Sequence, residues 1–492
     1  MPAQPAIVLG KKELYDKIFA CWLGKNIGGT LGAPYECQTY VHHLSFYDPK
    51  PKKSAPNDDL DIQLVWLAMM EQKGLPPRLP HFAEYWRKCW SAWPSNEYGF
   101  CMRNLARGLM PPVCGWFENY YVDEMGSPIR SEIWACLAPA NPQKAAALAW
   151  MDSVMDHAGG EGTYGEMFWA AVESAAFVIK DPDELIRIGL SMIPPACNIS
   201  RVIREVVWCH RNHIRYDEAR ERVVGIYGHL KSPCNAIQNH GFTIMGWLYG
   251  QGFGDKLCKA VNCGFDTDCT GATLGALLGI IGGTRGIPER WSNAVGKNIV
   301  LHRLTRLAEA PKNLHELTRR TIMLTEQYLR QFPAVGLGEK TRLGRDWRTV
   351  IYRNEEATAA WQTDVRSAVA SDKDVDIWFY YNGDPVMAPG DTRVIRVAGR
   401  KQGASVKGNI AIIPPKSWQV HKIGEHDFIL QANKVNRQNR ILVKSEIAGQ
   451  LYCGKFLFLG LDEAKGYPSL KNVVTCSVCG GNKDYCICNR SK

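Results

Sequence analysis

Two short acidic clusters are the residues of this sequence that are best suited to chemistry. Asn57-Asp58-Asp59 lies near the start of the chain, and Asp266-Thr267-Asp268 lies past its middle; each comes just before an apolar, helix-like segment. Carboxylate and amide oxygens are the ligands that hard divalent cations prefer. Buried carboxylates repel each other unless positive charge lies between them. We therefore predict that the two clusters meet in the fold and form one metal site.

The second cluster opens a segment in which Gly271, Gly275 and Gly279 recur at every fourth residue. This spacing puts the glycines on one stripe of a helix, where a neighbouring helix can pack closely. A helix buried in this way carries Asp266 and Asp268 at its start only if they are paired, protonated or bound to metal, and we favour metal.

An earlier glycine-rich segment, residues 24–36, ends in Glu36, and its Gly28 and Gly32 also allow close backbone approach. Close helix packing followed by a solvent-facing acid is the alternative interpretation. In the first acidic cluster, Asn57 and the aspartates can cap the helix that follows. A cap with acids favoured by the helix dipole is the alternative to a metal site there.

The elements that must position these residues are mainly helices. From Leu14 to about Gln331 apolar residues recur with helical periodicity, for example over 61–72, 142–155, 165–179 and 313–331. After Pro333 the pattern changes to short strands at 375–379, 393–397, 409–413, 440–443 and 455–459, with an Asn382-Gly383 turn. We predict a helical domain over residues 1–335, a small antiparallel β-sandwich-like domain over 336–470, and a cysteine-rich tail over 471–492.

Composition limits the class of protein. A chain of 492 residues exceeds one hydrophobic core. The net charge is +10, but the sequence has no long run of basic residues, so specific nucleic-acid binding is not indicated. A positive electrostatic field suits an anionic metabolite equally well. We see no signal peptide, and the longest apolar stretch, 271–283, is too short to span a bilayer. Most of the 17 cysteines stand singly in apolar stretches, which favours a reducing compartment, so we expect a cytoplasmic protein.

Taken together, these segments resemble the ADP-ribosylglycohydrolase family of dinitrogenase reductase-activating glycohydrolase-like proteins. Its members share a glycine-rich helix that ends in Glu, a Thr/Ser-Asp-Asp motif and a later Asp-x-Asp-Thr motif. Residues 126–130, Gly-Ser-Pro-Ile-Arg, look like the family's small-residue loop before an Arg, and residues 152–157 look like its His-bearing helix end. The resemblance covers about residues 14–300.

The resemblance implies an all-α domain that uses two divalent cations, commonly Mg²⁺ with Mn²⁺ as the alternative, to hydrolyse a bond at the anomeric carbon of a ribose. Carried over by motif, the metal ligands are Asn57, Asp58, Asp59, Asp266 and Asp268, and Thr270 is added as the substitute for the family's Thr. The same carry-over adds Glu36 to the metal shell and makes Glu36 or Asp58 the group that accepts a proton from water. It also implies that Gly126, Ser127, Arg130 and His157 line the substrate cleft.

Four positions depart from the family pattern. Asn57 replaces a Thr or Ser, Leu60 stands where a Thr is common, and Gly29 replaces a common Asp. Cys269 occupies the Thr position after the second Asp, and a thiol binds Mg²⁺ poorly. Either Thr270 takes its place, or the second cation binds weakly or not at all.

We expect a hydrolase acting on ADP-ribosylated protein or an ADP-ribose derivative. Two alternatives stay open: a glycosidase of the same fold acting on another glycoside or nucleoside, and a non-catalytic protein that binds a nucleotide or sugar. Asn235, Asn239 and His240 either line the site or serve as caps and loop contacts. The oligomeric state is not indicated by the sequence.

The tail carries four closely spaced cysteines: Cys476, Cys479, Cys486 and Cys488. Four thiolates at such spacing can hold a tetrahedral structural Zn²⁺. A reduced tail and disulfides are the alternatives.

Overall fold

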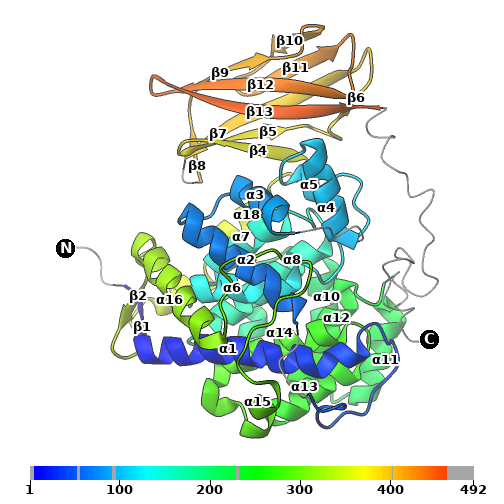
Figure 1. Cartoon of the computed structure of the whole chain (residues 1–492), viewed down its shortest axis with the longest axis vertical. Coiled ribbons are helices and arrows are strands. Elements are labelled where there is room, and N and C mark those ends of the chain that lie inside the picture. Colours follow the sequence, from blue (N-terminus) through cyan, green and yellow to red (C-terminus); the bar gives the residue numbers. More distant parts are fainter. Residues whose placement is uncertain (1–4, 52–55, 91–95, 229–231, 402, 462–492) are drawn as a thin grey trace.

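The computed structural model describes residues 5–51, 56–90, 96–228, 232–401 and 403–461. A helical body precedes a β-sandwich, which is stacked on one end of that body (Figure 1). This arrangement confirms the predicted fold class. The tail cysteines Cys476, Cys479, Cys486 and Cys488 lie outside the described residues. Within the part of the chain that is described, no helix has the length and apolar character needed to cross a membrane.

The helical body contains sixteen α-helices among the residues described, interrupted by three short 3₁₀ helices. They are α1 (Lys11–Gly32), α2 (Asp58–Lys73), α3 (Leu79–Cys89), α4 (Asn96–Arg107), α5 (Val113–Trp116), α6 (Ser131–Leu137), α7 (Pro142–Ser153), α8 (Glu161–Ala175), α9 (Pro182–Ser191), α10 (Asn198–Arg211), α11 (Tyr216–Tyr227), α12 (Ala236–Tyr249), α13 (Gly252–Asn262), α14 (Thr267–Gly282), α15 (Glu289–Val295) and α16 (Leu314–Gln331); the 3₁₀ helices are η1 (Ala33–Tyr35), η2 (Pro128–Arg130) and η3 (Thr284–Gly286).

The centre of this body is the antiparallel contact between α1 and α14, which we call the glycine seam. A β-carbon built at Gly28 would lie 1.8 Å from the carbonyl oxygen of Gly271, and one built at Gly275 would lie 2.1 Å from that of Gly24. The two backbones therefore touch directly, as the glycine spacing predicted. Antiparallel packing brings the start of α14, with its acids, against the end of α1.

The first strand was not predicted. Strand β1 (Ile7–Gly10) pairs in parallel with β2 (Val335–Gly338) and in antiparallel with β3 (Arg342–Leu343). Its four residues are too few to show a strand pattern by themselves, and its partners lie at the far end of the helical body.

Two helices, α17 (Trp347–Tyr352) and α18 (Glu355–Trp361), lie inside the region that we expected to be rich in strands. They pack on the helical body: Lys144 of α7 lies 2.7 Å from Glu356, and Tyr352 donates a 2.6 Å hydrogen bond to Glu184 of α9. With six and seven residues, these helices carry too few apolar positions to reveal a period.

The strands of the sandwich are β4 (Ser367–Asp372), β5 (Val375–Tyr380), β6 (Val386–Met387), β7 (Thr392–Lys401), β8 (Ala404–Val406), β9 (Asn409–Ile413), β10 (Trp418–Lys422), β11 (Asp427–Ala432), β12 (Gln438–Ile447) and β13 (Gln450–Gly460). One sheet has the order β10-β11-β7-β5-β4, with β8 on β7, and the other has the order β6-β13-β12-β9. Every pairing is antiparallel except that of β6 with β13. The sheets face each other through aromatic residues such as Phe379 and Phe456, whose ring centroids lie 4.8 Å apart.

The sandwich packs on α3 and lies next to α5 of the helical body (Figure 1). Arg78 forms an ion pair of 2.5 Å with Asp376, and the amide of Val369 donates to the carbonyl of Pro111 over 3.0 Å. Trp150 of α7 stacks on Trp378 of β5. Polar and aromatic contacts thus fix the position of the sandwich on the helices.

Candidate active site

The loop that carries Glu36 is held against the loop that carries Asp266. The amide of Cys37 donates to the carbonyl of Phe265, and the amide of Phe265 donates to the carbonyl of Gln38, both over 2.8 Å. Cys37 and Phe265 have positive φ angles of 65° and 68°, a conformation that few non-glycine residues adopt. This reciprocal pair of hydrogen bonds places Glu36 and Asp266 on neighbouring loop segments.

Two acids from the two predicted clusters meet at the start of α14. Ligand atoms of Asp59, Asp268 and Cys269 all lie within 4.8 Å of one another. The side chains of Asp59 and Asp268 are buried, with exposed fractions of 1% and 8%. The structure thus brings together acids that are separated by most of the helical body in sequence.

Asp266 belongs to the same group. Burial raises the pKa of the Cys269 thiol well above its usual range, and the charges of Asp266, Asp59 and Asp268 raise it further. Cys269 therefore stays protonated among three carboxylates. A protonated thiol is a poor ligand for a hard cation, so the oxygen atoms of the acids are the donors that this group offers.

The start of α2 differs from the prediction in one respect. Asn57 occupies the N-cap position, but its side chain makes no capping hydrogen bond; its Nδ2 atom instead donates to Asn26 over 3.3 Å. A β-carbon at Gly29 would lie only 3.0 Å from Asn57 Nδ2. Two of the departures from the family pattern are therefore coupled, because Gly29 makes room for Asn57. Asp58 is the first residue of α2.

The other predicted ligand, Thr270, lies one helical turn inside α14. It is fully buried, and its hydroxyl donates to the carbonyl of Thr267 over 3.1 Å. The hydroxyl of Thr267 in turn donates to the carbonyl of Gly32 over 2.8 Å, which ties α14 to the end of α1. Cys269, rather than Thr270, is the residue whose side chain lies within 4.8 Å of the ligand atoms of Asp59 and Asp268.

Helix α12 supports the Asp266 loop. Asn239 accepts a 3.2 Å hydrogen bond from the amide of Asp266 and donates to the carbonyls of Pro233 and Asn235. Asn235 caps α12 through its side chain, and buried His240 stacks on Trp169. Asn239 therefore has a positioning role that the sequence left open.

A fully buried polar network lies beneath Asp59. Gln63 donates to the carbonyl of Asp59 over 3.0 Å and to Glu132 over 2.8 Å, and Lys25 of α1 forms a 2.8 Å ion pair with Glu132. Buried charges persist only where they are paired and hydrogen-bonded. The network joins α1, α2 and α6, so it fixes the position of Asp59 relative to these helices.

Arg130 is fully buried in a second network. It makes two 2.8 Å hydrogen bonds to Asp156 and lies 3.1 Å from Asp152 and 3.9 Å from Glu166. Although burial opposes ionisation, Arg130 and His157 lower the pKa of Asp156 to about 2. The Ser127 hydroxyl donates to Glu166. Arg130 therefore anchors the loop of residues 126–130 from below.

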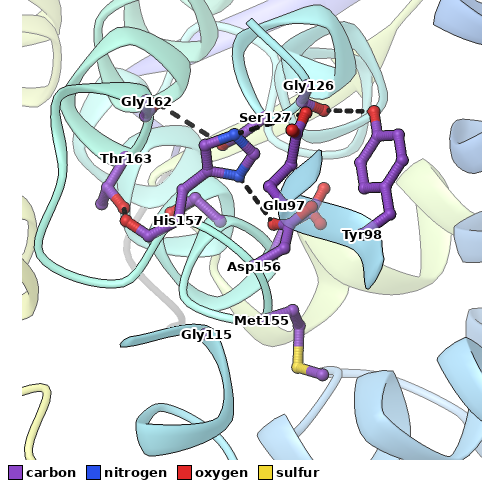
Figure 2. Close-up of polar contacts among 12 residues, drawn as sticks. Glu97, Tyr98, Gly115, Gly126, Ser127, Met155, Asp156, His157, Gly162 and Thr163 are labelled. Atoms are coloured by element: carbon purple, nitrogen blue, oxygen red, sulfur yellow. Dashed lines mark hydrogen bonds and ion pairs between the residues drawn. The ribbon is translucent and has the colours of Figure 1, made fainter. Parts of the chain in front are cut away.

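His157 is likewise fully buried. Figure 2 shows its ring beside Asp156 and Glu97. Its Nδ1 lies 2.9 Å from Asp156, its Nε2 lies 3.8 Å from Glu97, and Gly162 packs so closely on it that a β-carbon there would lie 2.4 Å from the ring. Tyr98 donates to the carbonyl of Gly126 over 3.1 Å. These contacts hold the loop with Gly126 and Ser127 in place, and Arg130 and His157 lie buried beneath it.

Three functional candidates were missed by sequence reasoning. Glu124 is buried and interacts electrostatically with Asp266; burial, partly offset by a hydrogen bond with Ser232, raises its pKa to about 8. Cys37 and Cys234 have sulfur atoms 3.6 Å apart, beside Glu36. No motif marks these residues, because each becomes interesting only through a partner that is distant in sequence.

Comparison with protein families identifies the family of the helical body. The model of the ADP-ribosylglycohydrolase family matches residues 10–322, which is more than half of the chain. The chain belongs to the ADP-ribosylglycohydrolase family. The acids, the glycine seam and the loop of residues 126–130 all lie within the matched region, and membership supports a glycohydrolase-type function.

The chain is also similar to a solved structure described as an ADP-ribosylglycohydrolase-related protein complex. The two share 19% sequence identity with a TM-score of 0.44, and the similarity covers 65% of this chain and 99% of the other. No curated protein matches this member of the ADP-ribosylglycohydrolase family significantly.

Proposed function

We propose that this ADP-ribosylglycohydrolase-family chain is a divalent-metal-dependent hydrolase that cleaves an N- or O-glycosidic ribosyl bond of ADP-ribosylated protein or of an ADP-ribose derivative. The observation that carries the proposal is the meeting of Asp59 and Asp268, buried and within 4.8 Å, with Asp266 beside them. Folding brings these acids together at a cost that bound cations offset.

The donor set fits Mg²⁺ or Mn²⁺. Asp59, Asp266 and Asp268 supply hard carboxylate oxygens. We assign Asn57 and Asp58 to the same shell by family motif, and Thr270 as the substitute for the family's Thr. Cations held by these residues would supply a water molecule with a lowered pKa. The chain's own contribution is rigidity, since the seam and the Lys25–Glu132 pair fix the acids before any ligand arrives.

Glu36 or Asp58 accepts the proton of the attacking water in this proposal. The reciprocal hydrogen bonds between residues 37–38 and Phe265 support Glu36 in this role, because they hold its backbone beside Asp266. Glu124 donates a proton to the leaving group: its raised pKa keeps it protonated at neutral pH, and it interacts with Asp266.

The backbone of Gly126 is proposed to contact the substrate. Ser127, Arg130 and His157 act as positioning residues in this proposal, since none of the three has solvent-exposed surface. The proposal also includes three domains, at residues 1–335, 336–470 and 471–492. It places the protein in the cytoplasm, and it assigns a structural Zn²⁺ to the cysteine-rich tail.

The decisive experiment compares three Asp→Asn variants on the first helix turns. With Mg²⁺ and ADP-ribosylated peptide, Asp59→Asn and Asp268→Asn should lose at least about a hundredfold in kcat/KM. Asp61→Asn is the matched control, because Asp61 is equally buried but accepts hydrogen bonds from His302 and Thr305 in a structural loop. Equal activity of Asp59→Asn and wild type would refute the proposed site.

Cys269 gives a specific reason to consider a non-catalytic binding protein, because it occupies a ligand position with a protonated thiol. Cys269→Thr restores an oxygen donor. The chain is a binding protein if the wild type binds ADP-ribose but does not hydrolyse ADP-ribosylated peptide, while the Cys269→Thr variant hydrolyses its ribosyl bond. Turnover by the wild type excludes this alternative, and a panel of other glycosides and nucleosides tests the remaining one.

A further inference from the structure

We propose that Glu36, Cys37 and Cys234 form a second metal site, which takes a thiophilic cation of the Zn²⁺ class. The three side chains offer one carboxylate oxygen and two sulfurs, all within 4.8 Å of one another. This donor set is chemically different from the oxygen-rich group at Asp59 and Asp268. Two thiolates select Zn²⁺ over Mg²⁺.

The sulfur geometry matches shared coordination. In a tetrahedral site with Zn–S bonds of about 2.3 Å, two sulfurs lie about 3.8 Å apart. The Cys37 and Cys234 sulfurs are 3.6 Å apart. A disulfide would require them to approach to about 2.05 Å. The observed separation is thus close to the edge of a coordination tetrahedron and far from a covalent bond.

The backbones of both cysteines are held in place by hydrogen bonds. Cys37 has a φ angle of 65° and donates its amide to Phe265. The carbonyl of Cys234 accepts from the amide of Met125, and its amide donates to Ser232 over 3.1 Å. Two loops that are distant in sequence therefore present their sulfurs to one point, as a ligand set must.

The surroundings favour a cation and allow it to enter. Glu36, Cys37 and Cys234 are all partly exposed to solvent. The negative charges of Asp266 and Glu36 act on Cys234. A divalent cation replaces the thiol protons, which pass to the buffer, and neutralises this excess of negative charge.

The consequence for catalysis rests on the proposed function. Because Glu36 is shared, a bound Zn²⁺ takes it away from the attacking water and lowers hydrolysis. Zn²⁺ binding itself does not depend on that function, so it is tested by a signal other than turnover.

The test uses the full chain, reduced with a phosphine, in which Cys476, Cys479, Cys486 and Cys488 are replaced by Ser so that the tail contributes no thiolate. Co²⁺ alone is the probe. We expect a thiolate-to-cobalt charge-transfer band that one equivalent of Zn²⁺ removes. Cys37→Ser and Cys234→Ser should each weaken the band, and the double variant should abolish it. Glu36→Gln should keep the band but weaken Co²⁺ affinity by about tenfold.

Cys453→Ser is the matched control, because Cys453 is also partly buried but lies in β13 of the sandwich; its band should equal that of the parent. Absence of the band in the reduced parent, or its persistence in the double variant, would overturn the proposal. So would peptide mapping that finds a Cys37–Cys234 disulfide in air together with no Co²⁺ binding after reduction. If the band is present and hydrolysis is absent, the metal site stands and the proposed hydrolase function fails.

Discussion

At the scale of single residues, Glu124 makes the activity depend on pH in a defined direction. Its pKa is raised from 4.5 to about 8, so the protonated form that donates to the leaving group is present below pH 8 and lost above it. We expect kcat/KM to fall as pH rises through about 8. Glu124→Gln should lower kcat and remove this limb from the pH profile, most clearly with poor leaving groups. An unchanged profile would exclude Glu124 as the proton donor.

His240 should make the fold sensitive to acid. Burial lowers its pKa from 6.5 to about 4, so the unfolded state binds a proton in a range where the folded state does not. Stability is therefore complete above pH 6.5 and falls as pH drops toward 4, by up to about 3 kcal/mol from this group. Urea unfolding from pH 4 to 7 should show a smaller slope for His240→Gln than for the wild type. Equal slopes would contradict the prediction.

At this scale, sequence reasoning located acids but not their partners. Asp59 and Asp268 were predicted from the pattern of acids before apolar segments, and the structure brings them together. Burial of Arg130 could not be read from the loop, because Asp152, Asp156 and Glu166 surround it only after folding. The alternative prediction that the Asn57 side chain caps α2 was wrong, because this side chain donates its hydrogen bond to Asn26 instead.

At the scale of helices and strands, the glycine seam controls where the acids lie. Gly28→Ala would place a methyl group 1.8 Å from a carbonyl oxygen, so α1 and α14 must separate. We expect a loss of about 3 kcal/mol or more in unfolding free energy. Chemical denaturation measures it.

Gly225→Ala is the matched control for the seam. It also lies inside a helix, α11, but a β-carbon there meets nothing within 4 Å. It should gain about 0.5–1 kcal/mol from helix propensity. Similar losses in the two variants would mean that the contact is softer than the geometry indicates.

Most long elements were predictable because their periodicity is local. The predicted strand 409–413 coincides with β9 (Asn409–Ile413), and helices 142–155 and 313–331 correspond to α7 and α16 within about two residues. Elements whose stability comes from distant partners were missed. β1 is defined by pairing with Val335–Gly338, and α17 and α18 by packing on the helical body.

At the scale of the whole molecule, cation binding should stabilise the folded chain. If the acids bind cations only when folded, a hundredfold excess over Kd contributes about 2.7 kcal/mol. Chelator should therefore lower Tm by about 5 °C and abolish hydrolysis, and Mg²⁺ should restore both. Asp59→Asn should show little Tm response to chelator. A wild-type Tm that is indifferent to chelator would contradict metal binding by the helical body.

The glycine seam also bears on how relatives of this chain can diverge. The atom that a new side chain would meet at Gly24, Gly28 or Gly32 is a main-chain carbonyl, so no smaller residue on the opposite helix can relieve the clash. A substitution in one helix of this contact therefore cannot be compensated by a substitution in the other, as it can in most packed interiors. Change in specificity is therefore expected in the loops that carry Glu36, Glu124 and Cys234, at positions other than these three, while the two backbones keep their distance.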